Sequence, residues 1–202
     1  LSQMELINIS KLVSYVPQSV NSNFPMTVFD VVLLGRRPHI NWKLGEKDLE
    51  IVSNTIDYLN LQPFAFRKFD QLSGGERQRV IIAKAIAQEP SLFLLDEPTS
   101  DLDLKNQIEI MKRLRELTSD NSTNRSALVA IHDINMAARF ADKIILLHEG
   151  EIKQFGAPDE VLTVKNIEDV FSVTSQIVPA TDNTPLRIIV NDEIANNNEK
   201  EE

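Results

Sequence analysis

The chain has 202 residues, of which 42% are hydrophobic and 25% are charged, and its formal net charge is −9. This composition is typical of a globular protein large enough to bury a core, so disorder is not the expectation for most of the chain. The absence of cysteine excludes disulfides and thiolate metal sites. No apolar run approaches the roughly 18 residues of a membrane span, and no basic block indicates nucleic-acid binding.

The first half of the chain predicts one short strand and then several helices. Residues 1–11 show no clear period, and residues 12–16 are a strand stopped by Pro17, with Gln18 at its end. Three later segments repeat apolar residues every three or four positions and are predicted helices: 26–34, 46–59 and 75–88. The first of these is expected to end at Gly35.

The second half alternates strands and helices. Two short apolar runs, 91–95 and 127–131, are of the type that is buried on both faces of a parallel sheet. Helices are expected over 104–117, with Asp103 as its N-cap, and over 134–140. The later elements are a hairpin around Glu149-Gly150, a short helix and one strand, in the order 143–148, 151–155, 158–162 and 186–190.

Residues 72–80 read as a loop that turns into a helix. Ser73 can cap that helix, and Glu76, three residues later, completes a capping box, while Gly74 and Gly75 allow a close backbone approach. The first amides of a helix lack internal partners and lie at its positive end, so this loop predicts an anion site for a phosphate. The alternative is an ordinary capped helix after a Gly-Gly turn.

Polar side chains follow both predicted buried strands. Asp96 and Glu97 come directly after the first, and His132 follows the second. Ligands gather at the carboxyl ends of parallel strands, so these side chains are expected to converge. Gln18, beyond the end of its own strand, could reach a metal or an attacking water through its amide. Two adjacent carboxylates are costly after an apolar run unless a cation engages them, which predicts Mg²⁺ at Asp96 and a general base at Glu97. The alternatives are a solvated surface turn and an ordinary strand-end histidine.

Taken in chain order, these groups resemble the ATP-binding-cassette ATPases. The likeness covers about residues 12–165 and rests on a set of motifs in a fixed order: Gln18, Leu-Ser-Gly-Gly-Glu-Arg-Gln-Arg at 72–79, Leu-Leu-Asp-Glu-Pro at 94–98, Ser-Asp-Leu-Asp at 100–103, and His132. The signature followed by the Asp-Glu-Pro strand is highly specific.

The resemblance implies that the signature residues bind ATP held by a second subunit. These residues are Ser73, Gly74, Gly75 and Glu76, and Asp101 matches the aspartate of the family's D-loop. The site on this chain would then complete a pocket on another chain.

The resemblance also implies roles for the strand-end residues. Gln18 matches the Q-loop glutamine, which contacts the metal and the attacking water, and Asp96 matches the Mg²⁺-associated aspartate. Glu97 matches the catalytic glutamate, and His132 matches the switch histidine that contacts the γ-phosphate.

The implied fold is α/β: a partial P-loop NTPase (RecA-like) core with parallel strands plus an α-helical subdomain, with the amino-terminal β-subdomain absent. Residues 1–18 would be a remnant of the nucleotide-binding core, 19–90 the helical subdomain with the signature, and 91–165 the carboxyl-terminal part of the ATPase core. Residues 166–190 would be an extension, and 191–202 an acidic, disordered tail.

Segments 27–32, 35–39 and 137–162 are similar to importers of iron-siderophore, haem and cobalamin complexes. This resemblance implies an ATP-hydrolysing importer subunit that uses Mg²⁺ with ATP and lies peripherally at the cytoplasmic face of the cell membrane. Its implied partners are a second ABC ATPase subunit, expected as a homodimer, and transmembrane permease subunits, reached through the Q-loop and helical subdomain. A substrate-binding protein is an indirect partner, and no nucleic acid is expected.

The family's phosphate loop, Gly-x-x-x-x-Gly-Lys-Ser/Thr, is expected upstream of Gln18, but the seventeen residues there contain no glycine. We therefore expect a carboxyl-terminal fragment of an importer ATPase. One alternative is a non-hydrolysing partner that lends its signature to another cassette. Another is a soluble cassette ATPase of DNA repair or translation, although the 53 residues between Gln18 and Leu72 leave no room for a long coiled coil.

Overall fold

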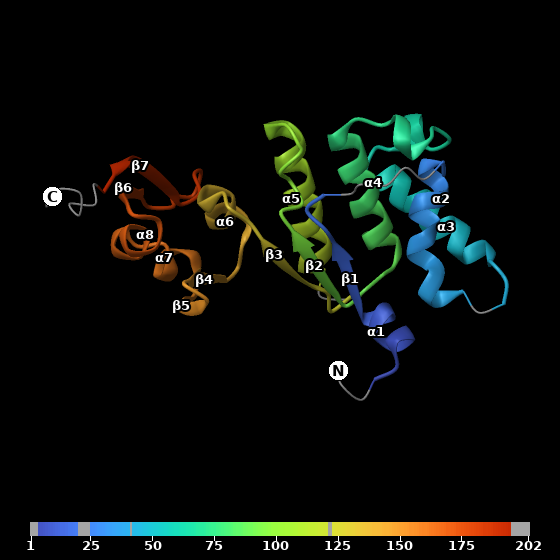
Figure 1. Ribbon diagram of the computed structural model, residues 1–202, viewed down its shortest axis with the longest axis horizontal. Coiled ribbons are helices and arrows are strands. Elements are labelled where there is room, and N and C mark those ends of the chain that lie inside the picture. The colour runs from blue at the N-terminus through green and yellow to red at the C-terminus, as the bar shows by residue number, and fades with distance from the viewer. Residues whose placement is uncertain (1–3, 20–24, 41, 121–122, 195–202) are drawn as a thin grey trace, which may run out of the picture. The chain divides into compact units, whose positions relative to one another are not determined.

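The computed structural model describes residues 4–19, 25–40, 42–120 and 123–194. The chain divides into two compact units, Leu1–Ala130 and Ile131–Glu202. The first unit holds a parallel sheet and the three longest helices, and the second holds two antiparallel hairpins (Figure 1). Within the described ranges, no helix has the length and apolar character that crossing a membrane requires.

The sheet of the first unit has three parallel strands in the order β1-β2-β3. Their bounds are β1 (Val13–Val16), β2 (Leu92–Asp96) and β3 (Ser126–Ala130). The register pairs Val16 with Leu95 and Asp96 with Ala130, so all three strands end at the same edge of the sheet. The predicted central position of the 91–95 run is confirmed.

Neither apolar run is buried on both faces, as runs of this type usually are. In β2, Phe93 and Leu95 are buried, whereas Leu94, on the opposite face, is only half-buried. Tyr15 and Leu128 pair with Leu94 from either side, and they are 59% and 54% exposed. In a sheet of three strands, two are edge strands, so β3 does not acquire the burial that its composition suggested.

The helices of the first unit follow the predicted apolar periodicity. The described helices, with η for 3₁₀ turns, are α1 (Leu6–Leu12), α2 (Val28–Leu33), η1 (Leu34–His39), α3 (Glu46–Tyr58), η2 (Gln62–Phe64), η3 (Phe69–Gln71), α4 (Gly74–Ala87) and α5 (Leu104–Ser119). Figure 1 shows α2, α3 and α4 as neighbours that pack on one another. Helix α1 was not predicted, and none of its side chains is buried, so it leaves no apolar period in the sequence.

Helix α2 ends at Leu33, two residues before the predicted end at Gly35, and the chain continues as the tighter turn η1, which packs on the end of α4. A Cβ atom built on Gly35 would lie 2.2 Å from the carbonyl oxygen of Lys84. The next residue, Arg36, is buried, and its Nη1 donates to the carbonyl of Ala87 at 2.7 Å. His39 Nε2 lies 2.8 Å from the carbonyl oxygen of Gln88. These contacts satisfy carbonyls that the end of a helix leaves unpaired.

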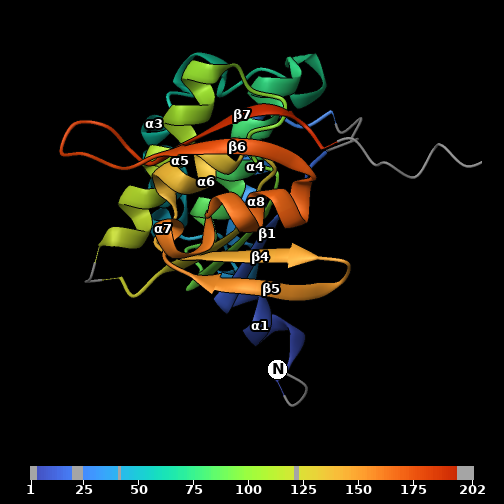
Figure 2. The ribbon, with the colours of Figure 1, turned by 90° about the vertical axis from the view of Figure 1, so that its left-hand side faces the viewer.

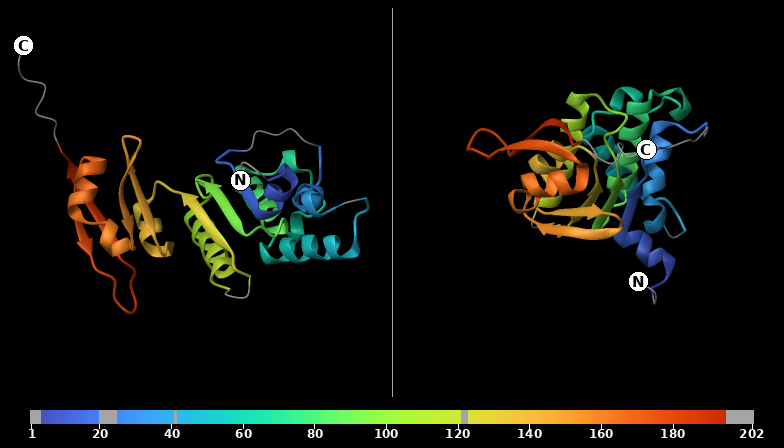
Figure 3. Two further views of the ribbon diagram at one scale, coloured as in Figure 1. Left: turned by 90° about the horizontal axis from the view of Figure 1, so that it is seen from below. Right: turned by 60° about the vertical axis from the view of Figure 1, so that its left-hand side comes forward.

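The second unit is built from two hairpins and three short helices. These elements are α6 (Ile134–Phe140), β4 (Ile144–His148), β5 (Glu151–Gly156), α7 (Pro158–Val161), α8 (Val164–Phe171), β6 (Val173–Val178) and β7 (Arg187–Glu193). The predicted hairpin is confirmed, because Glu149 and Gly150 both have positive φ, as a tight turn between β4 and β5 requires. Figures 2 and 3 show α8 lying between the two hairpins.

The second hairpin pairs β6 with β7, and only β7 was predicted. It packs with α8 around a small core made of Leu162, Ile167, Leu186 and Ile188. Helix α8 and strand β6 were not predicted. The disordered acidic tail predicted for 191–202 is wrong at its start, because residues 191–193 belong to β7, and residues 195–202 lie outside the described part of the chain.

We expect Gly35→Ala to destabilise the first unit by at least about 2 kcal/mol, because the new methyl group would press on the backbone of α4. Urea unfolding should show a lower midpoint at an unchanged slope. Gly45→Ala is the matched control, since its Cβ would lie 3.4 Å from the nearest atom, Asp48 Oδ2. The control should lose less than about 1 kcal/mol. Equal losses in the two variants would contradict the close approach at Gly35.

Candidate functional site

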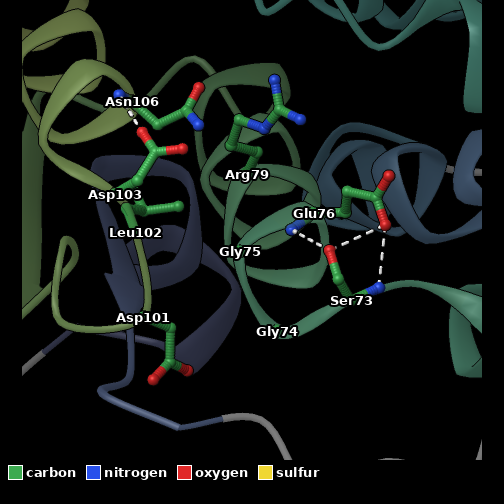
Figure 4. A pocket seen from close by; sticks show the side chains of 9 residues that line it. All are labelled: Ser73, Gly74, Gly75, Glu76, Arg79, Asp101, Leu102, Asp103 and Asn106. Carbon is green, nitrogen blue, oxygen red and sulfur yellow. Dashed lines mark hydrogen bonds between the residues drawn. The ribbon is translucent and has the colours of Figure 1, made fainter.

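The predicted capping box at the start of α4 is present. Ser73 Oγ accepts a hydrogen bond from the backbone N–H of Glu76 at 3.4 Å, and Glu76 Oε2 accepts from both the backbone N–H and the hydroxyl of Ser73 at 2.8 Å (Figure 4). These bonds hold the pKa of the Glu76 carboxyl below its ordinary value. The bond from the Ser73 backbone N–H is the largest cause, and the bond from the Ser73 hydroxyl is the second. The helix therefore begins at a fixed point, with the amides of Gly74 and Gly75 in its first turn.

The two glycines lie against the loop that carries Asp101. A Cβ on Gly75 would lie 3.2 Å from the Asp101 carbonyl oxygen and 3.2 Å from Leu102 Cδ2. A Cβ on Gly74 would lie 3.8 Å from Asp101 Oδ2. The structure thus brings the predicted signature and D-loop residues together, and Gly75 is the residue that permits the approach.

A cavity of about 520 Å³ lies between these segments. Its lining combines α4 with the start of α5, as Figure 4 shows, and consists of Ser73, Gly74, Gly75, Glu76, Arg79, Asp101, Leu102, Asp103 and Asn106. The amides and dipole of α4 and the Arg79 guanidinium favour an anion there, while the carboxylates limit where it can lie.

Arg79 and Asn106 line this cavity, and neither was predicted as a site residue. Arg79 lies one turn after Glu76, and its buried Nε makes no hydrogen bond within the described part of the chain. Asn106 donates its backbone N–H to Asp103 Oδ1 at 2.9 Å, which confirms Asp103 as the N-cap of α5. The capping prediction could have indicated Asn106, because a capped first turn lies beside the loop that precedes it.

Gln107 holds the Asp101 loop in place and was also missed. Its side-chain amide donates to the carbonyl of Thr99 at 3.1 Å and to that of Leu102 at 3.0 Å. The Leu102 N–H in turn donates to the Thr99 carbonyl at 3.1 Å. One side chain thus fixes both ends of the turn that contains Asp101.

Asp96 and Glu97 lie at the shared edge of the sheet, and Gln18 follows β1 at the same edge. Glu97 has φ of 44°, a left-handed conformation that is costly for a residue with a side chain. Its N–H donates to the Ala130 carbonyl at 3.0 Å, and its own carbonyl accepts from the N–H of Ser100 at 3.2 Å. Such strain, maintained by surrounding bonds, is characteristic of functional positions.

Asp96 fits the predicted Mg²⁺ chemically. It offers a half-buried carboxylate at a strand end, and proteins usually hold Mg²⁺ through one or two carboxylates together with substrate phosphates. The amide oxygen of Gln18 is a further hard ligand of the type that Mg²⁺ accepts. Asp96 and Gln18 are the protein ligands that this prediction requires.

His132 belongs to the second compact unit. It directly precedes Asp133, whose Oδ1 accepts from the N–H of Asn135 at 2.8 Å and of Met136 at 3.0 Å and so caps α6. The predicted convergence of His132 with Asp96 and Glu97 stays a prediction.

Comparison with known proteins identifies the family. A family model described as ABC transporter matches residues 1–100. An uncharacterized ABC transporter ATP-binding protein of Methanocaldococcus jannaschii is 45% identical over 177 residues, which are 88% of this chain and 68% of that protein. The chain belongs to the ABC transporter ATP-binding family. The family resemblance read from the motifs is thereby confirmed.

Other relatives of this ABC chain have named cargoes. A petrobactin import ATP-binding protein of Bacillus anthracis is 33% identical over 92% of this chain and 69% of its own length. A cobalamin import ATP-binding protein of Halobacterium salinarum is 38% identical over 80% of this chain and 40% of its own length. The ABC chain thus spans at most about two thirds of these relatives.

Solved structures confirm the predicted fold class of the ABC chain. A metal-chelate type ABC transporter in an inward-facing conformation matches with a TM-score of 0.77 and 36% identity over 89% of this chain and 73% of that one. An ATP-binding cassette, solved as a dimer with ADP and phosphate, matches with a TM-score of 0.66 and 31% identity over 77% of this chain and 68% of that one. The fold is α/β with the parallel strands of a P-loop NTPase.

We expect Glu76→Gln to destabilise the ABC chain by about 1 kcal/mol at neutral pH, because a neutral amide makes a weaker cap. The folded-state pKa of Glu76 is lowered, so its contribution is present above its ordinary pKa of 4.5 and is lost as the pH falls through the folded-state value. Urea unfolding at a series of pH values should show the two proteins converging in acid. Glu50→Gln, at an exposed glutamate of α3, controls for the loss of one negative charge. A gap that persists unchanged in acid would contradict the capping role.

Proposed function

We propose that this chain acts as the ATP-binding and ATP-hydrolysing subunit of an importer. The observation that supports this most directly is the capped start of α4, which presents the first-turn amides of Gly74 and Gly75 beside Asp101. A terminal phosphate of ATP suits this site, and an ATP held by the phosphate loop of a second subunit would be completed by it. Two such subunits would enclose two ATP molecules.

The strand-end residues carry the chemistry in this proposal. Glu97 accepts a proton from the attacking water, and its backbone bonds to Ala130 and Ser100 hold it in the required place. The amide of Gln18 orients the same water, and His132 donates a hydrogen bond to the γ-phosphate. Asp96 holds Mg²⁺, which, when bound with ATP, neutralises charge on the phosphates.

We propose a metal chelate as the cargo: an iron-siderophore, haem or cobalamin complex. Relatives named for petrobactin and cobalamin import, and the likeness to a metal-chelate type transporter, support this class. Transmembrane permease subunits would dock on the helical segment and the loop after Gln18, which places the chain at the cytoplasmic face of the membrane. A second copy of the chain is the proposed partner cassette, and a substrate-binding protein acts through the permease.

Glu97→Gln tests the catalytic assignment. In the transporter assembled with the complete gene product, we expect ATP still to bind while kcat falls by about 10²–10⁴-fold, because the amide cannot accept the proton from water. Steady-state ATPase assays and nucleotide binding measure the two quantities. Glu149→Gln is the matched control, since Glu149 is another glutamate with positive φ, in the β4–β5 turn. An unchanged kcat in Glu97→Gln would refute the role.

Ser73→Arg tests whether the signature acts on the second subunit's nucleotide. The long cation would fill the anion site, so we expect nucleotide-dependent dimerisation to be lost. Analytical ultracentrifugation of the Glu97→Gln protein with and without ATP, in the presence and absence of Ser73→Arg, measures this effect. Ser119→Arg, at the exposed end of α5, is the control. Normal dimerisation of the Ser73→Arg protein would count against the proposal.

A further inference from the structure

The side chain of Asn135 makes two hydrogen bonds to a single residue of the C-terminal hairpin. Its Nδ2 donates to the carbonyl of Ile188 at 3.0 Å, and its Oδ1 accepts from the N–H of Ile188 at 2.8 Å. Asn135 is the second residue of α6, and Ile188 lies near the start of β7, 53 positions later in the sequence. This pair of bonds joins two elements that no local pattern connects.

These two bonds satisfy the backbone N–H and carbonyl that Ile188 presents at the outer edge of β7. In an antiparallel pair, the N–H and carbonyl of one residue point to the same side, and those of Ile188 turn away from its partner Ile177 on β6. An asparagine amide presents one donor and one acceptor as a peptide group does, so Asn135 substitutes for a residue of a third strand. Ile188 is buried, so its backbone groups would otherwise be costly to leave unpaired.

The same turn of α6 is fixed from its other side by Asp133. The N–H of Asn135 donates to Asp133 Oδ1, so Asn135 is bonded through both its backbone and its side chain. Ile134 and Ala138 pack against the core that contains Ile188. Only Asp133 lies between His132 and the first residue of α6, Ile134.

We propose that Asn135 is a positioning residue for His132, through which strand β7 holds the turn that carries the histidine. This inference rests on the proposed function, which gives His132 its contact with the γ-phosphate. In this proposal the C-terminal segment 164–193 contributes to catalysis indirectly, because it holds the turn next to His132 in position. Loss of the amide should lower kcat and leave the KM for ATP nearly unchanged, because the histidine acts on the reacting phosphate.

The structural part of the proposal can be tested without ATP hydrolysis. The chain has three histidines, so the ring C–H signals of His132 can be assigned in NMR spectra and followed separately. Asn135→Ala should shift or broaden the His132 signals and speed amide exchange at Ile188, while the His39 signals stay in place. Asn166→Ala is the matched control, since Asn166 Nδ2 donates to the Val161 carbonyl at 2.7 Å in the same unit.

Two results would overturn the proposal: His132 signals that do not move although Ile188 exchanges faster, or signals that move equally in Asn166→Ala. If Asn135→Ala does not fold, Asn135→Asp serves, because it keeps the acceptor for the Ile188 N–H and lacks the donor. The same criteria then apply to that variant.

The catalytic part is measured in the complete transporter. We expect kcat to fall severalfold in Asn135→Ala at a constant KM for ATP, with Asn166→Ala near wild type. An unchanged kcat in an active transporter would overturn the positioning role. If His132 moves but the wild-type transporter hydrolyses no ATP, the placement of His132 by β7 stands and the proposed function falls.

Discussion

The predicted anion site depends on how α4 is held at its two ends. At the start, Ser73 and Glu76 close the capping box, and Gly75 lets the Asp101 loop approach the first turn. At the far end, buried Arg36 donates to the Ala87 carbonyl at 2.7 Å and pairs with Asp48 at 3.0 Å. Arg36 is buried, so its guanidinium would be costly to leave there without these partners. Both ends of α4 are therefore held by contacts outside the helix's own backbone bonds.

Side-chain amides hold in place the turns that contain or adjoin predicted site residues. Gln107 fixes both ends of the Asp101 turn through the carbonyls of Thr99 and Leu102. Asn135 fixes the first turn of α6 through both backbone groups of Ile188. An amide is suited to this role because it remains neutral and offers two donor hydrogens and an acceptor oxygen. Gln107 uses its two donors, and Asn135 uses one donor and its acceptor. Neither residue bears charge that would disturb a phosphate nearby.

The sequence predicted the helix caps and the hairpin turn, because each depends on residues close together in the chain. The cap at Ser73, the N-cap at Asp103 and the hairpin at Glu149-Gly150 all depend on residues within a few positions of one another, and all are present. Asn135 bonds to Ile188, 53 positions away, and leaves no such mark in the sequence. Gln107 bonds to nearby backbone carbonyls, but it looks like an ordinary helix residue until those partners are known. The exposure of β3 was also beyond reach, since a run of apolar residues does not reveal how many strands flank it.

Hydrogen bonds hold the residues just before and just after His132, and each set of bonds lies within its own unit. Before the histidine, Ala130 pairs with Asp96 in the sheet, and its carbonyl accepts from the N–H of Glu97 at 3.0 Å. After it, Asp133 caps α6 with Oδ1 at 2.8 Å from the N–H of Asn135. His132 directly precedes this cap, so the bonds that fix the first turn of α6 also restrict the backbone next to the histidine. The second unit therefore supplies its own constraint on the residue that is proposed to contact the γ-phosphate.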